Sequence, residues 1–298
     1  SSLRSYQASE GADSGLKDGD FAILQKPLQT LDQLMMFTNY GHLIQRPVHE
    51  IADLKWKEMG EHISQSIGLA ADEAIIAAFA FKPNEQAGYF VIGTDDGYIK
   101  QTAFSDLLPS RTYRSKAQDF IKLHADAHVT NVNWIPSDEG LAVFSASYKG
   151  YGLSFTLSEV SVSGAKASGV KLMDLKDGDV VIGFTLYHPE DKHAAVAIVT
   201  QRGAFKRMLL SEVGLTSRAR RGVLILRELK KEPHRVAAMV SVEQASELLI
   251  HTDQQEVIAI NPYQHATADR YSNGSFVMDV DEVGQPAFVQ TTIPVENE

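Results

Sequence analysis

The chain has 298 residues, is 44% hydrophobic and contains no cysteine, which excludes disulfides and thiolate metal sites and fits a reducing cytoplasm. No continuous apolar stretch approaches the length of about eighteen residues that a membrane-spanning helix needs, so we expect a soluble protein. The formal net charge of −10 argues against nucleic acid, but the charge is segregated. Residues 201–235 carry ten Lys and Arg against three acids, and residues 236–298 carry one Arg against ten acids. One sector is therefore basic.

A module of strand, turn and strand recurs along the chain. The turn residues of five copies lie 52 to 56 residues apart, and in three copies a Ser-acid-apolar triplet ends ten positions after the turn. We interpret this triplet as the end of the second strand. Strand-built repeats of roughly this size are typical of a propeller or a related radial array with one blade per repeat. The turn residues are Gly41, Gly97, Gly150, Gly203 and Gln255, and the triplets begin at Ser105, Ser158 and Ser211.

Short strands, acid-rich turns and the near absence of helical periodicity predict an all-β chain. In chain order, the first strand of each full repeat is expected at 34–38, 89–93, 142–147, 194–200 and 246–252. Tyr6 and Gly15 fit a truncated copy at the N-terminus, so the chain is expected to begin inside a repeat and to be a fragment of a longer polypeptide. The residues after Pro286 are expected to be extended or disordered. The predicted single domain has six repeats, at 1–33, 34–86, 87–139, 140–192, 193–245 and 246–298.

The segments G-Y-I-K at 97–100 and G-A-F-K-R at 203–207, with the triplets that follow them, resemble one known repeat. It is the repeat of the C-terminal domain of the A subunit of bacterial type IIA topoisomerases, a family that includes gyrase and topoisomerase IV. The resemblance covers essentially the whole chain and implies a six-bladed β-pinwheel. Gyrase A subunits carry the box Q-R-R-G-G-K-G where residues 9–15 read S-E-G-A-D-S-G. The topoisomerase IV branch is therefore the better match, also at residues 48–57, and an open or broken array is expected.

The candidate DNA-binding residues are Lys and Arg that recur at equivalent offsets from the turns. Equivalent offsets occupy equivalent places on the blades, so these side chains are expected to form a band along one edge. Such a band can follow the phosphates of a duplex without reading its sequence. The candidates are Arg46, Lys55, Lys57, Lys100, Arg111, Arg114, Lys116, Lys166, Lys206, Arg207, Arg218, Arg220, Arg221 and Arg270.

Catalytic and cofactor signals are lacking in the sequence, which has no P-loop, no G-x-S-x-G and no defensible Ser/His/Asp set. His124, Asp126 and His128 have a metal-like spacing, but in a strand or loop they need not converge, so no metal site is predicted. The family resemblance implies that this domain needs no cofactor, whereas the whole enzyme is expected to use ATP and Mg.

The resemblance implies sequence-nonspecific binding and bending of duplex DNA, which would be presented to the cleavage core for decatenation and relaxation. The implied partners are DNA, the rest of the topoisomerase A subunit and, through it, the B subunit, with no membrane. The domain is expected to be monomeric by itself and to lie in the cytoplasm with the nucleoid. Two alternatives stay open: the DNA-wrapping domain of the gyrase A subunit, and a propeller that serves as a protein-interaction scaffold. An exposed apolar patch without a basic band would favour the scaffold.

Overall fold

The computed structural model describes residues 2–3, 21–54, 58–243 and 246–292. The chain forms two compact units. The first contains residues 1–92, 100–137 and 162–169, and the second contains residues 93–99, 138–161 and 170–298. The predicted all-β class is confirmed, with two short helices, α1 (Ile63–Ile67) and α2 (Val280–Val283), in the described part of the chain.

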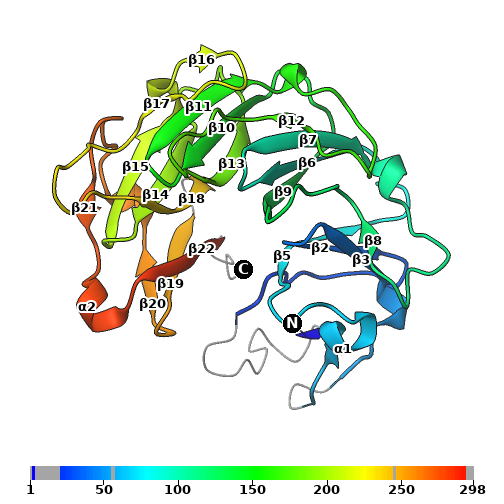
Figure 1. Ribbon diagram of the computed structural model, residues 1–298. Helices are drawn as coiled ribbons and strands as arrows, with labels where there is room; N and C mark the ends of the chain where they lie inside the picture. Colours follow the sequence, from blue (N-terminus) through cyan, green and yellow to red (C-terminus); the bar gives the residue numbers. More distant parts are fainter. Residues whose placement is uncertain (1, 4–20, 55–57, 244–245, 293–298) are drawn as a thin grey trace. The chain divides into compact units, whose positions relative to one another are not determined.

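Each full repeat supplies three antiparallel strands of one sheet, and the first of these strands lies between the other two (Figure 1). The first strands are β2 (Gln33–Thr38), β6 (Tyr89–Thr94), β10 (Ala142–Ser147), β14 (Ala195–Thr200) and β19 (Glu247–Thr252). The second strands are β3 (His42–Pro47), β7 (Tyr98–Ala103), β11 (Tyr151–Thr156), β15 (Ala204–Leu209) and β20 (Val257–Ile260). The third strands are β5 (Ile75–Phe81), β9 (Val129–Ile135), β13 (Val181–Tyr187), β18 (Val236–Val242) and β22 (Pro286–Thr292).

The outer strand of a sheet comes from the following repeat. A short strand pairs with the second strand of the preceding sheet, as in Ala204↔Phe276 between β15 and β21. Each of the first four blade sheets is completed in this way. Each of these sheets therefore extends past the predicted end of its repeat into the next one. The outer strands are β8 (Gln118–Asp119), β12 (Val170–Lys171), β16 (Leu215–Thr216) with β17 (Val223–Leu224), and β21 (Ser275–Phe276).

The structure contains five blade sheets in the described residues, not the six predicted. The first repeat is represented by β1 (Ser2–Leu3), which pairs with β4 (Glu61–His62) in a two-stranded sheet. Because β4 has the same place in its repeat as the outer strands have in theirs, β1 stands where the first repeat would have its second strand. The departure from the gyrase box at residues 9–15 lies outside the described residues, and the expected opening of the array stays a prediction. At the other end of the chain, Pro286–Thr292 is an ordinary blade strand.

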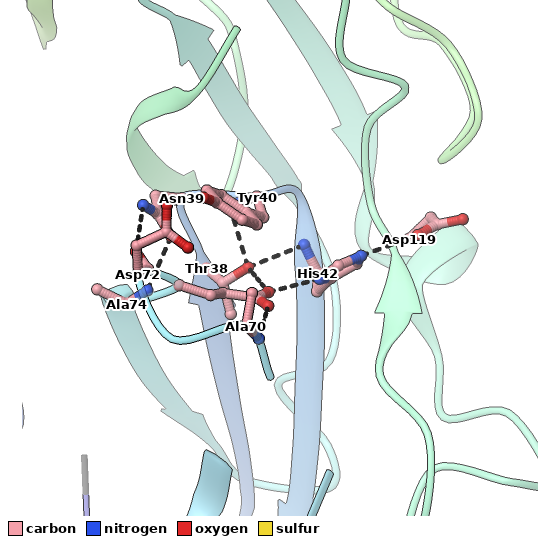
Figure 2. A network of polar contacts seen from close by, with 9 residues as sticks. Thr38, Asn39, Tyr40, His42, Ala70, Asp72, Ala74 and Asp119 are labelled. Carbon is pink, nitrogen blue, oxygen red and sulfur yellow. Dashed lines mark hydrogen bonds and ion pairs between the residues drawn. The ribbon is translucent and has the colours of Figure 1, made fainter. Parts of the chain in front are cut away.

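A hydroxyl group closes each blade hairpin. In the first full repeat the N–H of His42 donates to the Thr38 hydroxyl at 3.1 Å (Figure 2). Glu73 binds both side chains. A Thr or Ser stands three residues before the turn residue in all five repeats, and its hydroxyl always accepts the N–H that follows the turn. The corresponding pairs are Tyr98 with Thr94, Tyr151 with Ser147, Ala204 with Thr200 and Glu256 with Thr252.

The Ser-acid-apolar triplets are 3₁₀ turns, which corrects their interpretation as strand ends. The segments are η3 (Phe104–Leu107), η4 (Leu157–Glu159) and η5 (Leu210–Glu212), and each begins directly after the second strand. The turn buries the apolar residue of the triplet, for example Val160 and Val213, and leaves the acid exposed at the blade edge.

Packing within each unit is apolar and aromatic. In the first unit the ring of Phe37 lies 5.0 Å from that of Phe90 and 4.9 Å from that of Phe120, a spacing at which aromatic pairs attract beyond simple burial. In the second unit β14 is buried at all six positions, which explains its continuous run A-V-A-I-V-T. A central strand covered on both faces has no polar alternation.

The glycine nineteen positions after the turn allows close contact between two backbones. A Cβ at Gly222 would lie 2.3 Å from the carbonyl oxygen of Gly152 on β11, and the φ of Gly222 is +90°. We therefore expect Gly222→Ala to lower the free energy of unfolding by about 2–3 kcal/mol, through steric overlap and backbone strain. Urea denaturation would measure the loss. The matched control is Gly214→Ala, because nothing lies within 4 Å of that position, and an equal loss in both variants would contradict the close-contact explanation.

Candidate nucleic-acid interface

The structure separates the predicted basic residues by exposure. Arg46, Lys100 and Lys206 are buried, with 5%, 0% and 2% of their surfaces exposed. Lys55 and Lys57 lie outside the described residues. Half-buried are Arg207, Arg218 and Arg270, and exposed are Arg111, Arg114, Lys116, Lys166, Arg220 and Arg221.

The buried ammonium group of Lys100 binds backbone carbonyls. Its Nζ donates to the carbonyl oxygens of Gly164 at 2.9 Å, Ala165 at 3.1 Å and Ala167 at 3.3 Å. These three residues belong to the loop of the following repeat. Burial lowers the pKa of Lys100 to about 8. An ammonium group enclosed by carbonyls cannot reach a phosphate, which corrects the predicted contact.

Lys206 repeats this arrangement in the second unit. Its Nζ donates to the carbonyl oxygens of Asp269 at 3.3 Å, Arg270 at 2.8 Å and Ser272 at 2.8 Å, and it also binds the carbonyl of Ile225. Burial lowers its pKa to about 8 as well. Lys206 is therefore also removed from the candidate DNA contacts.

Arg46 also binds carbonyls of the following repeat, although it lies five residues after its turn glycine and the two lysines lie three residues after theirs. Its guanidinium donates to the carbonyls of Tyr113 at 3.2 Å and Arg114 at 3.3 Å, again in the loop of the following repeat. In the second unit Arg207 donates to the carbonyls of Pro262 and His265. Both arginines hold loops. Arg46 is buried and is removed from the candidate contacts for the same reason as the lysines, whereas half-buried Arg207 stays a predicted contact.

Two further arginines have part of their polar groups engaged. Arg218 donates from Nη1 to the carbonyl of Lys171 at 2.6 Å. Arg270 donates from Nη1 to the carbonyl of Leu224 at 2.9 Å. Both stay half-buried, so they contribute charge to the surface while anchoring their loops.

The exposed candidates lie in the loops that precede the outer strands. In the first unit, the loop before β8 carries Arg111, Arg114 and Lys116, and Lys166 belongs to the next such loop. The Arg114 side chain is 70% exposed although it pairs with Glu50, and this arginine lowers the pKa of that carboxyl. Surface pairs of this kind are weak, so the pair with Glu50 does not withdraw Arg114 from the surface.

In the second unit, Arg220 and Arg221 line a shallow cavity of about 510 Å³ between β16 and β17. Its walls also include Leu153 and Val223. The Arg221 guanidinium lies 4.3 Å from the centre of the Tyr151 ring, a cation–π contact that orients it at the surface. This cavity thus brings two exposed cations beside apolar side chains.

Sequence reasoning missed Lys171 and Lys176 in the second unit. Both are exposed, and they bind the two oxygens of Asp174 at 2.9 and 2.7 Å. This pairing lowers the pKa of Asp174 to about 2, with Lys176 as the larger contributor. The signal that could have found Lys171 is its place in an outer strand beside the loop with Arg218.

No group of three or more His, Asp or Glu in the described residues could hold a metal ion. The described residues also include no helix long and apolar enough to cross a membrane.

The fold defines the class of protein as an all-β, propeller-like array of blades. Residues 32–82, 88–127, 143–186 and 195–243 match the family described as "DNA gyrase C-terminal domain, beta-propeller". The chain belongs to this family, as the sequence resemblance implied.

Individual relatives agree with the topoisomerase IV branch. The chain is 40% identical over 289 residues to the A subunit of DNA topoisomerase 4 from Bacillus subtilis, which covers 95% of this chain and 34% of that protein. It is similar to the solved structure titled "Crystal structure of the C-terminal domain of DNA topoisomerase IV", at 37% identity and a TM-score of 0.89 over 96% of this chain and 87% of that chain. The structure titled "Structure of DNA gyrase A C-terminal domain" shares the fold, at 22% identity and a TM-score of 0.70, over 89% of this chain and 84% of that chain. The chain spans about a third of the length of the curated relatives that it matches.

Proposed function

We propose that the chain binds duplex DNA without sequence preference and bends it, as the C-terminal domain of a topoisomerase IV A subunit. The observation that carries this proposal is the recurrence of exposed Arg and Lys in the loops before the outer strands. They are Arg111, Arg114, Lys116 and Lys166 in the first unit and Arg220 and Arg221 in the second.

Phosphate contacts of this kind position a duplex but read no bases. A bend of 40–90° costs on the order of 1–6 kcal/mol, which several such contacts on successive blades can offset. In the whole enzyme, the domain would present DNA segments to the cleavage core for decatenation and relaxation. The B subunit, ATP and Mg belong to that proposed assembly, in the cytoplasm and at the nucleoid.

The first test is binding to duplexes of unrelated sequence over a salt series. If roughly five phosphates are engaged, log K should fall against log salt with a slope near −4 to −5, because each neutralised phosphate releases counterions. Fluorescence anisotropy would measure the slope, and a circular-permutation gel assay would measure the bend. Salt-independent binding, or strong preference for one sequence, would contradict the proposal. A large positive linking-number shift in religated circles would indicate gyrase-like wrapping.

A further inference from the structure

The acid of the Ser-acid-apolar triplet also binds the basic loop of the following repeat, at one junction that has a buried lysine and at one that lacks it. Glu159 accepts the N–H of Arg218 at 3.0 Å, and Glu212 accepts the N–H of Arg270 at 3.3 Å. Both N–H groups lie fifteen residues after the turn residue of the following repeat. In the loop with Arg270 the acid therefore binds a backbone N–H, whereas Lys206 binds the carbonyls. The loop with Arg218 has only the acid of this pair.

The carbonyls bound by each lysine have fixed offsets. Lys100 and Lys206 both bind the carbonyls that lie 14, 15 and 17 residues after the following turn residue. The residue skipped at offset 16 is Lys166 in one loop and Tyr271 in the other, and both side chains are exposed. Carbonyls that converge on an internal cation leave the intervening side chain at the surface.

We propose that Lys100 and Lys206 are positioning residues for DNA binding, because their ammonium groups hold loops 163–169 and 267–274 with Lys166 and with Arg270 and Tyr271 at the duplex. The inference rests on the function proposed above. It assigns to the lysines of the G-x-x-K pattern an indirect role, in which they act through the loop of the following repeat.

One junction lacks this lysine. Leu153 stands at the position equivalent to Lys100 and Lys206, and it lines the cavity beside Arg220 and Arg221. The carbonyl of Arg220, at offset 17, accepts the N–H of Asp174 at 3.0 Å and has no ammonium partner among the described residues. The Leu153 side chain is buried, as those of Lys100 and Lys206 are. The carbonyls of Ser217, Arg218 and Arg220 stand at the offsets that the two lysines bind in their own loops, so we expect Leu153→Lys to add the missing contact.

The test compares Lys206→Met with Lys192→Met, which removes an exposed lysine, in the 298-residue chain. For Lys206→Met we expect faster hydrogen exchange of amides 267–274 and about tenfold weaker binding to a duplex, equivalent to about 1.4 kcal/mol. The salt slope should become shallower by about one, because a phosphate contact is lost. Lys192→Met should leave the exchange and the slope unchanged.

A folded Lys206→Met protein with the exchange and salt slope of the control would overturn the proposal. If Lys206→Met does not fold, Leu153→Lys decides: we expect slower exchange of amides 216–222 and tighter binding, and no change in either would refute the idea. Failure of the unmodified chain to bind DNA would refute the DNA-binding function itself. The exchange result would then still decide whether Lys206 holds its loop.

Discussion

Reversing the charge of Arg220 and Arg221 to Glu is expected to weaken duplex binding by roughly a hundredfold or more. Both guanidinium groups are exposed beside the cavity of the second unit, and a hydrogen bond to a charged group contributes about 1.5–3 kcal/mol. The salt slope should become shallower by about two. Folding should survive, because the ion pair of Arg221 with Asp177 is long, at 3.8 Å, and surface-exposed.

Arg218 is left unchanged in this experiment because its guanidinium and its N–H both anchor the loop. The matched control reverses Lys26 and Lys192, which are exposed and lie outside the proposed band. Anisotropy titrations at one salt concentration would compare the two double variants. Equal losses would show that affinity comes from the diffuse field of the protein and that no defined band exists.

The second large effect concerns stability and its pH dependence. Lys206→Met removes a cation that binds several carbonyls and leaves them unsatisfied, so we expect a loss of about 2–4 kcal/mol in the free energy of unfolding at pH 7. Denaturant unfolding would measure it. Exposed Lys192→Met should cost less than about 0.5 kcal/mol.

The difference in the free energy of unfolding between the unmodified chain and Lys206→Met should increase as pH rises above 8. Burial lowers the folded-state pKa of Lys206 to about 8, below the unfolded value near 10.5. Between these two pH values the unfolded state binds more protons, so the free energy of unfolding increases with pH, by at most about 1.4 kcal/mol per pH unit. If this difference decreases over pH 8–10, the carbonyls raise the folded-state pKa of Lys206, and burial does not lower it.

Much of the fold could be predicted because short sequence patterns that recur in each repeat determine the blade hairpins. The turn glycines such as Gly97 and Gly203 have positive φ values of 86° and 81°, which other residues adopt at a cost. Gln255 takes the same conformation, with φ 66°, which explains why the degraded fifth copy still forms a blade. The Thr or Ser that closes each turn was equally visible in the sequence but was not recognised.

The candidate site was harder to predict because burial of the basic residues is non-local. Lys100 was taken for a surface residue, yet its ligands lie 64 to 67 residues further along the chain. No periodicity within one repeat reveals that the next repeat covers its second strand. Lysine is rarely buried, so the default expectation of exposure was the wrong one where carbonyls compensate the charge.

The described residues form five blade sheets instead of the six predicted, for a related reason. A repeat in sequence was equated with a complete sheet, whereas each of the first four blade sheets takes its outer strand from the following repeat. Tyr6 and Gly15 indicated a first copy, but the described residues of that copy supply only Ser2–Leu3 to a two-stranded sheet. In the described residues, the six predicted repeats therefore correspond to five blade sheets and one two-stranded sheet.

Outer strands are donated in one direction only, from a repeat to the sheet of the repeat before it. If residues 262–276 open, the sheet of β14 and β15 loses β21, and Lys206 loses three of its acceptors at the same moment. If instead the loop before β14 opens, no strand is withdrawn from β19, β20 and β22. Local unfolding should thus spread toward the N-terminus more readily than toward the C-terminus. Each repeat that donates an outer strand stabilises the sheet of the repeat before it.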